Sequence, residues 1–185
     1  AYDDPRSPTW LDLYDHSQDG YWQRVLHDSG LVVALRDGIP AGLDLVDVSD
    51  PDDVRPLASM SGTEYTGAWL DGRALVVSLA NALFSYDLSD PSAPQFRSVA
   101  PIADHPGRRW LTGVGQVLLA VARPGTLQAF AAHDPLLLTD LGPQPVNADR
   151  IDALAAGDGV LYALLATTTN GQTAVDLATY AVQPD

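Results

Sequence analysis

The sequence predicts an all-β protein, a β-propeller whose blades are four repeats of roughly 43 residues. Four apolar segments begin at Leu31, Leu75, Val117 and Val160, so successive starts lie 44, 42 and 43 residues apart. Each segment follows a turn that contains Gly and precedes a second, alternating segment. Every acidic residue except Glu64 is Asp, which favours turns and strand ends over helices. Gly and Pro recur too often for long amphipathic helices, which leaves short strands and turns.

Within each repeat, we expect four strands joined by short turns. The first strand carries the sequences VLHD, GAWLD, RRWLTG and IDALAAG in the four repeats. The second strand is the apolar segment, and the third begins at Leu43, Leu83, Leu127 and Leu177. The fourth strand follows an Asp-Pro turn and carries VRPLASM, PQFRSVAP or LLLTDLG. The sequence therefore predicts one propeller domain over residues 1–185, with blades at about 20–62, 63–104, 105–146 and 147–185.

The last repeat differs from the others because it ends after its third strand, LATYAVQPD from Leu177. The segment PTWLDLYD at residues 8–15 precedes the first repeat and has the alternating pattern of a strand. We expect this segment to complete the last blade and to remove an exposed sheet edge. Two arrangements stay open: a four-bladed ring closed within one chain, and a ring shared with a second copy or a partner chain.

The turns after the third strands carry a family resemblance. The segments LDLVDVSDPDDVRPL from Leu43 and LFSYDLSDPSAPQF from Leu83 place Asp-x-Ser-Asp-Pro between two strands, and a weaker copy, LQAFAAHDP, begins at Leu127. These segments resemble the LVIVD-type propeller repeat, over about residues 20–185. The resemblance implies a propeller, often on secreted or surface-anchored proteins, and hence an extracellular or cell-surface location. It implies no common catalytic residue, so none is assigned.

Composition excludes several classes of function. The net charge is −14 and the ten basic residues are all Arg, so the chain lacks the clustered cations that general nucleic-acid binding needs. Apolar runs such as residues 117–122 are too short to span a bilayer, which argues against membrane insertion. The absence of Cys removes disulfides, zinc–thiolate sites and thiol nucleophiles.

Asp side chains gather at the Asp-Pro turns, where oxygen ligands could hold calcium. The weak metal candidates are Asp47, Asp50, Asp87 and Asp90. The EF-hand pattern is absent, and recurrence in successive repeats favours Asp as an acceptor for turn N–H groups. We therefore expect no cofactor, with calcium as the alternative.

Arg and aromatic residues supply the main candidate for a binding site. In a propeller, the loops that enter the first strands and those between the second and third strands should share one rim. The candidate ligand-binding residues on these loops are Arg24, Arg36, Arg108, Arg109, Arg123, Arg150, Tyr21, Trp22, Tyr65 and Trp110. Arg binds carboxylate, sulfate or phosphate through paired N–H groups, and aromatic rings stack on sugars. The alternative is that these Arg residues pair with the many Asp residues and hold the loops together.

The sequence favours a non-catalytic binding or scaffold module that recognises a protein, a glycan or a small anionic ligand on this rim. One alternative is a hydrolase or lyase at the mouth of the channel. Its acid–base residues would be His105, Asp104 and Glu64, although no nucleophile motif is present. A second alternative is a structural subunit that completes a larger assembly, as a homo-oligomer or with a partner chain.

Overall fold

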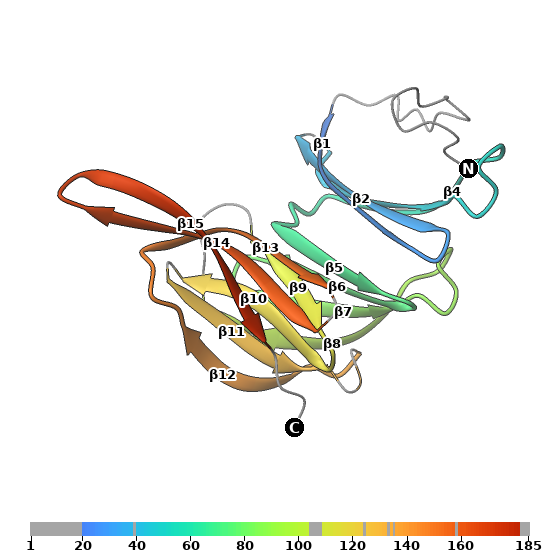
Figure 1. Cartoon of the computed structure of the whole chain (residues 1–185). Helices are drawn as coiled ribbons and strands as arrows, with labels where there is room; N and C mark the ends of the chain where they lie inside the picture. Colours follow the sequence, from blue (N-terminus) through green and yellow to red (C-terminus); the bar gives the residue numbers. More distant parts are fainter. Residues whose placement is uncertain are drawn as a thin grey trace. The chain divides into compact units, whose positions relative to one another are not determined.

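The computed structural model describes residues 20–181 except positions 39, 104–108, 124, 133, 135 and 158, and leaves the side chains of residues 20–23 and 38 undescribed. All regular structure in this part of the chain is antiparallel β-sheet, in four sheets (Figure 1). The predicted fold class, an all-β propeller with four blades, is confirmed. Within the same residues, no helix has the length and apolar character needed to cross a membrane.

The chain divides into two compact units, Ala1–Glu64 and Tyr65–Asp185. The first unit contains sheet A, whose strands follow one another in the order β1-β2-β3-β4. These strands are β1 (Gly20–Asp28), β2 (Leu31–Gly38), β3 (Gly42–Asp47) and β4 (Arg55–Ser61). Sheet A is therefore a simple meander, as expected for one repeat of four successive strands.

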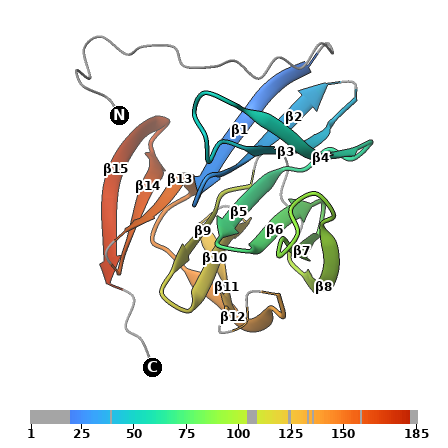
Figure 2. The same ribbon diagram turned by 90° about the vertical axis from the view of Figure 1, so that its right-hand side faces the viewer.

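The second unit contains three further meanders. Sheet B consists of β5 (Gly67–Asp71), β6 (Ala74–Leu79), β7 (Ala82–Asp87) and β8 (Gln95–Pro101). Sheet C consists of β9 (Leu111–Val114), β10 (Val117–Arg123), β11 (Thr126–Ala131) and β12 (Thr139–Pro145). Sheet D consists of β13 (Arg150–Gly157), β14 (Val160–Thr169) and β15 (Gln172–Ala181). The first strand β9 lies beside both β5 and β13, so first strands are neighbours in successive sheets (Figure 2).

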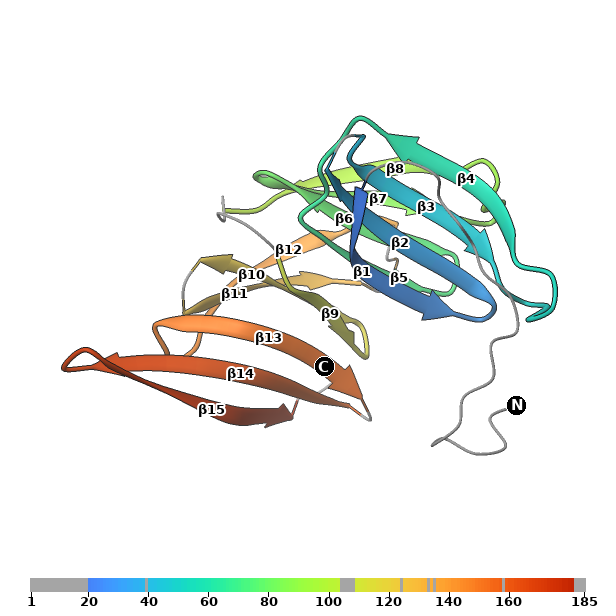
Figure 3. The same ribbon diagram turned by 90° about the horizontal axis from the view of Figure 1, so that it is seen from above.

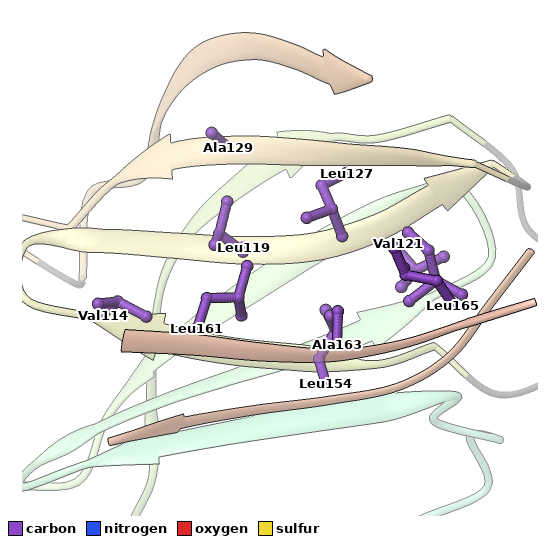
Figure 4. Packing of buried hydrophobic residues seen from close by; sticks show 10 residues of the cluster. Val114, Leu119, Val121, Leu127, Ala129, Leu154, Leu161, Ala163 and Leu165 are labelled. Atoms are coloured by element: carbon purple, nitrogen blue, oxygen red, sulfur yellow. The ribbon is translucent and has the colours of Figure 1, made fainter. Parts of the chain in front are cut away.

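Two apolar cores hold the three sheets of the second unit together. Between sheets B and C, Val76, Leu118 and Phe130 are fully buried. Between sheets C and D, residues from β9, β10, β11, β13 and β14 interlock (Figure 4). The second strand β10 packs through both faces, with Leu118 and Ala120 in the first core and Leu119 and Val121 in the second, which explains why its sequence is apolar at consecutive positions.

The repeats also share an irregularity. In sheets A, B and C, the register between the third and fourth strands shifts at the equivalent place, next to Val46, Tyr86 and Phe130 respectively. Such a bulge increases the local twist of the outermost strand.

Sheet D shows three strands among the described residues, and the segment predicted to complete it, residues 8–15, lies outside that part of the chain. The hairpin of β14 and β15 pairs over ten residues on each strand without a register shift. This hairpin is longer than the corresponding strands of the other sheets, which span six to eight residues.

A close contact between first strands gives a test of this packing. A Cβ atom on Gly113 of β9 would lie 2.6 Å from Cζ2 of Trp69 on β5. We therefore expect Gly113→Ala to lower the free energy of unfolding by about 1–3 kcal/mol, the usual range for overpacking. The control is Gly157→Ala, because a Cβ at that position meets nothing within 4 Å. Urea denaturation measures both variants, and equal stabilities would contradict the contact.

Candidate functional site

The Arg residues predicted to bind a ligand occupy different environments. Arg36 on β2 is buried in the first unit. Its Nη1 donates to the carbonyl of Pro40 at 2.7 Å, and its Nη2 donates to Oγ of Ser59 at 3.2 Å. Its Nε lies 3.1 Å from Oδ2 of Asp44. Arg36 thus connects β2, β3, β4 and the loop after β2, as in the interpretation that Arg holds loops together.

Arg109 is also buried, with 1% of its surface exposed, just before β9. Its Nη1 donates to the carbonyl of Val121 at 2.7 Å. Its Nη2 donates to the carbonyls of Ala80 and Ala103, at 2.9 and 3.0 Å. These acceptors come from the turn after β6, the segment after β8, and β10. The guanidinium therefore ties the loops of sheets B and C together, and we call this arrangement the Arg109 clamp.

Backbone hydrogen bonds also join the segment that carries Arg109 to sheet B. The N–H of Arg109 donates to the carbonyl of Thr66 at 2.7 Å, and the N–H of Thr66 donates to the carbonyl of Ser78 at 2.9 Å. A Cβ atom on Gly67 would lie 2.1 Å from the carbonyl oxygen of Arg109. Gly is therefore required at the start of β5, where the two sheets approach each other.

The remaining Arg candidates that the structure describes also differ in their surroundings. Arg24 on β1 is half-buried, and burial lowers the pKa of its guanidinium. Arg150 is exposed and pairs with Asp152, which raises the pKa of Arg150 and lowers that of Asp152. Arg123 is exposed at the end of β10, and Arg108 lies outside the described residues.

The aromatic candidates divide in the same way. Tyr65 is buried, and Trp110 packs against the core between sheets C and D. Tyr21 and Trp22 lie on β1, but their side chains are outside the described part of the structure. Of the proposed acid–base residues, Glu64 is exposed, whereas Asp104 and His105 fall outside the described residues.

The Asp-Pro turns repeat one hydrogen-bond pattern in three sheets. The side chain of Asp50 accepts from the N–H of Asp52 at 3.0 Å, and its carbonyl accepts from the N–H of Asp53 at 3.1 Å. Asp90 and Asp134 receive the equivalent pairs of bonds. An Asp at the first position with Pro at the second is typical of a type I turn, so the side chain completes the turn.

A second acidic position precedes two of these turns. Asp47 accepts from the N–H of Ser49 at 2.9 Å. Asp87 accepts from the N–H and Oγ of Ser89, at 2.8 and 2.6 Å, and from Nη2 of Arg97 at 2.7 Å. The hydrogen bond from the Ser89 side chain has the largest effect and that from Arg97 the next, and together they hold the pKa of Asp87 well below its ordinary value. The weak metal candidates therefore have turn partners, and the described residues contain no group of three His, Asp or Glu side chains placed to hold a metal ion.

An apolar surface on sheet D was not expected from the sequence. The residues Tyr162, Leu164, Val175 and Leu177 are each between 38% and 66% exposed, and we call them the outer face of sheet D. Leu164 and Leu177 are directly opposed across β14 and β15. The opposite side of β14 carries Leu161, Ala163 and Leu165, which are buried against sheet C. The available signal was the unbroken apolar run of β14, which resembles β6 and β10 although only one of its sides is covered.

Comparisons with known proteins show structures of similar fold but identify no family. No protein-family model matches the chain, and no curated protein sequence matches it. Among solved structures, the computationally designed Ika4 protein aligns with a TM-score of 0.62 and 11% identity, over 96% of this chain and 99% of that chain.

Two natural proteins align over smaller shares of their own length. The glutaminyl cyclase of Myxococcus xanthus has a TM-score of 0.54 and 18% identity, over 82% of this chain and 64% of that chain. A Bacteroides uniformis protein, described as a putative 6-phosphogluconolactonase, has a TM-score of 0.57 and 13% identity, over 83% of this chain and 54% of that chain. At these identities the likeness concerns the fold alone.

The Arg109 clamp predicts a large cost for a conservative change. Arg109→Lys removes the planar set of donors, so buried carbonyls lose their partners, and we expect unfolding to become easier by about 3 kcal/mol. Arg123→Lys is the matched control, because that exposed side chain should tolerate the change within about 0.5 kcal/mol. Urea denaturation followed by Trp fluorescence measures both, and an equal effect would refute the clamp.

The lowered pKa of Asp87 predicts a loss of stability in acid. The folded state favours the carboxylate, so its contribution is complete above the pKa of an unfolded Asp, about 4, and disappears as the pH falls further. Asp87→Asn should lower the urea midpoint at pH 7 and flatten its decline below pH 4. The exposed Asp71 gives the control Asp71→Asn, whose decline should follow the wild-type protein. A parallel decline in all three proteins would contradict the assignment.

Proposed function

We propose that this chain is a non-catalytic binding module that takes a partner protein on the outer face of sheet D. The observation that carries the proposal is a set of four large apolar side chains, contiguous on two paired strands and exposed. Contiguous exposed apolar surface of this kind marks interaction sites in soluble proteins. The core of a protein interface is likewise apolar and rich in aromatic residues. Tyr162 would supply the aromatic contact in this interface.

Charge indicates which partner is favoured. The net charge of −14 attracts a basic partner and speeds its encounter, whereas a second copy of the chain carries the same charge and is repelled. The partner is therefore a protein with an apolar patch surrounded by Lys or Arg. The anionic ligand considered from the sequence is less well supported, because Arg36 and Arg109 are buried on internal acceptors and Arg150 pairs with Asp152.

The remaining parts of the proposal rest on the sequence resemblance. We assign the repeats to the LVIVD type because of the Asp-x-Ser-Asp-Pro turns that begin at Asp47 and Asp87. The same resemblance favours an extracellular or cell-surface location. In this proposal the Asp residues of the turns are structural, and no cofactor takes part.

A displayed peptide library, selected on the immobilised full chain, supplies the probe for this function. Selected peptides should combine apolar and basic residues, and calorimetry should show a negative heat-capacity change on binding. Leu177→Asp should weaken binding at least tenfold, because it places a charge in an apolar contact. Leu141→Asp is the matched control, since Leu141 on β12 is also exposed, by 51%.

Two outcomes would overturn the proposal. One is peptide binding that Leu177→Asp and Leu141→Asp affect equally. The other is a loss of folding stability with Leu177→Asp that the control does not show, because the outer face would then be covered within the chain itself. The milder Leu164→Thr separates the two effects if Leu177→Asp fails to fold.

A further inference from the structure

The hairpin of β14 and β15 ends in a loop of two exposed residues, Asn170 and Gly171. Just before the loop, the N–H of Thr168 donates to Oδ2 of Asp149 at 2.6 Å, which joins the hairpin to the segment that precedes β13. Beyond that bond the hairpin extends past β13 and sheet C (Figure 3). The side chain and the backbone of the loop are therefore open to water.

The backbone of this loop is that of a type I′ turn, because φ is +53° at Asn170 and +78° at Gly171. A turn of this type bonds the residues on either side of the loop, here Thr169 and Gln172, and directs the N–H of the second loop residue to solvent. The nitrogen of Gly171 can therefore lose its proton and act as a nucleophile. Without a Cβ on Gly171, no side chain hinders its attack.

We propose that Asn170 is a site of spontaneous deamidation. The N–H proton of Gly171 passes to solvent, and its nitrogen forms a bond to Cγ of Asn170. The bond between Cγ and Nδ2 then breaks, and Nδ2 takes up a proton and leaves as ammonia. Water opens the resulting five-membered imide at either of its two carbonyls, which gives Asp or isoAsp at position 170. Water is the one co-reactant, and nothing is oxidised or reduced.

The positive φ of Asn170 suits the cyclic intermediate. Closure of the ring brings Cβ and the Gly171 nitrogen to one side of the Cα–C bond, which sets ψ of Asn170 near about −120°, the value at the first loop position of a type II′ turn. Type II′ is the other favoured two-residue hairpin loop. The change from type I′ to type II′ rotates the peptide between the two loop residues and makes φ of Gly171 negative, which Gly adopts readily. The hairpin can therefore form the imide and keep its strand pairing.

The other two Asn residues of the chain lack this combination. Asn81 and Asn147 are each followed by Ala, whose Cβ hinders attack by the amide nitrogen. The N–H of Ala148 also donates to the carbonyl of Val146 at 2.9 Å, so its nitrogen is already engaged. Deamidation should therefore be confined to Asn170.

The reaction changes the charge and the geometry of the hairpin end. A neutral amide becomes a carboxylate, so the net charge moves from −14 to −15. IsoAsp also adds a methylene to the backbone, and the lengthened loop no longer matches a two-residue turn. This inference goes beyond the proposed function, because Leu164 and Leu177 form the sixth pair of the ladder counted from the loop. Peptide affinity should therefore be the same before and after deamidation.

Peptide mapping of the full chain, incubated at mildly alkaline pH in isotope-labelled water, tests the proposal. Asp and isoAsp should appear at position 170 with labelled oxygen, while Asn81 and Asn147 stay intact. Gly171→Ala should slow the conversion at least tenfold, because a side chain at that position crowds the nitrogen and disfavours a positive φ. The matched control is Gln172→Ala, which keeps Asn170 next to Gly and should leave the rate within twofold.

The same incubation in guanidinium chloride gives the rate of the unfolded chain. The folded chain should convert within tenfold of that rate, since the turn accommodates the ring. A folded chain that reacts more slowly than this would overturn the proposal. Asp without isoAsp would also overturn it, because direct hydrolysis of the amide gives Asp alone. An equal effect of the two variants would exclude Gly171 as the source of the nucleophile.

Discussion

The need to cover an apolar strand on both faces is the constraint on which the second unit depends. On β10, Leu118 packs in the core between sheets B and C, and its strand neighbour Leu119 packs in the core between sheets C and D. Each such strand needs a sheet on either side, which a meander cannot supply for itself. Stacking of successive sheets meets that need and leaves the fourth strands at the periphery. There, polar residues and Pro cost little, and β8 and β12 are accordingly mostly exposed.

Local sequence signals were sufficient for the fold class. The spacing of the apolar segments follows from one strand meander per repeat, and the Asp-Pro turns follow from hydrogen bonds within four residues. The candidate ligand-binding site, in contrast, could be predicted only if the directions of the long Arg side chains were known. Arg109 turns inward because carbonyls of Ala80, Ala103 and Val121 converge on it, and these residues are distant from one another in the sequence. No pattern near Arg109 reports that convergence, so its burial could not be derived from the sequence.

In sheet D, the sequence pattern predicted burial for residues that the structure shows to be exposed. The run from Val160 to Ala166 is as apolar as β6, and periodicity alone assigns both to a core. The structure distinguishes them, because Tyr162 and Leu164 are exposed whereas Val77 is not. Burial is decided by what lies beside a sheet, and a single strand carries no information on that neighbour.

The Arg109 clamp has a consequence for the ionic conditions that this protein can tolerate. Its acceptors are peptide carbonyls inside the molecule, so neither the ions of the medium nor the ionisation of a carboxylate weakens it. A surface with an excess of acidic groups, by contrast, repels itself most strongly in dilute buffer, and added salt relieves that repulsion. Added salt should therefore leave the clamp intact and reduce the repulsion between the acidic groups.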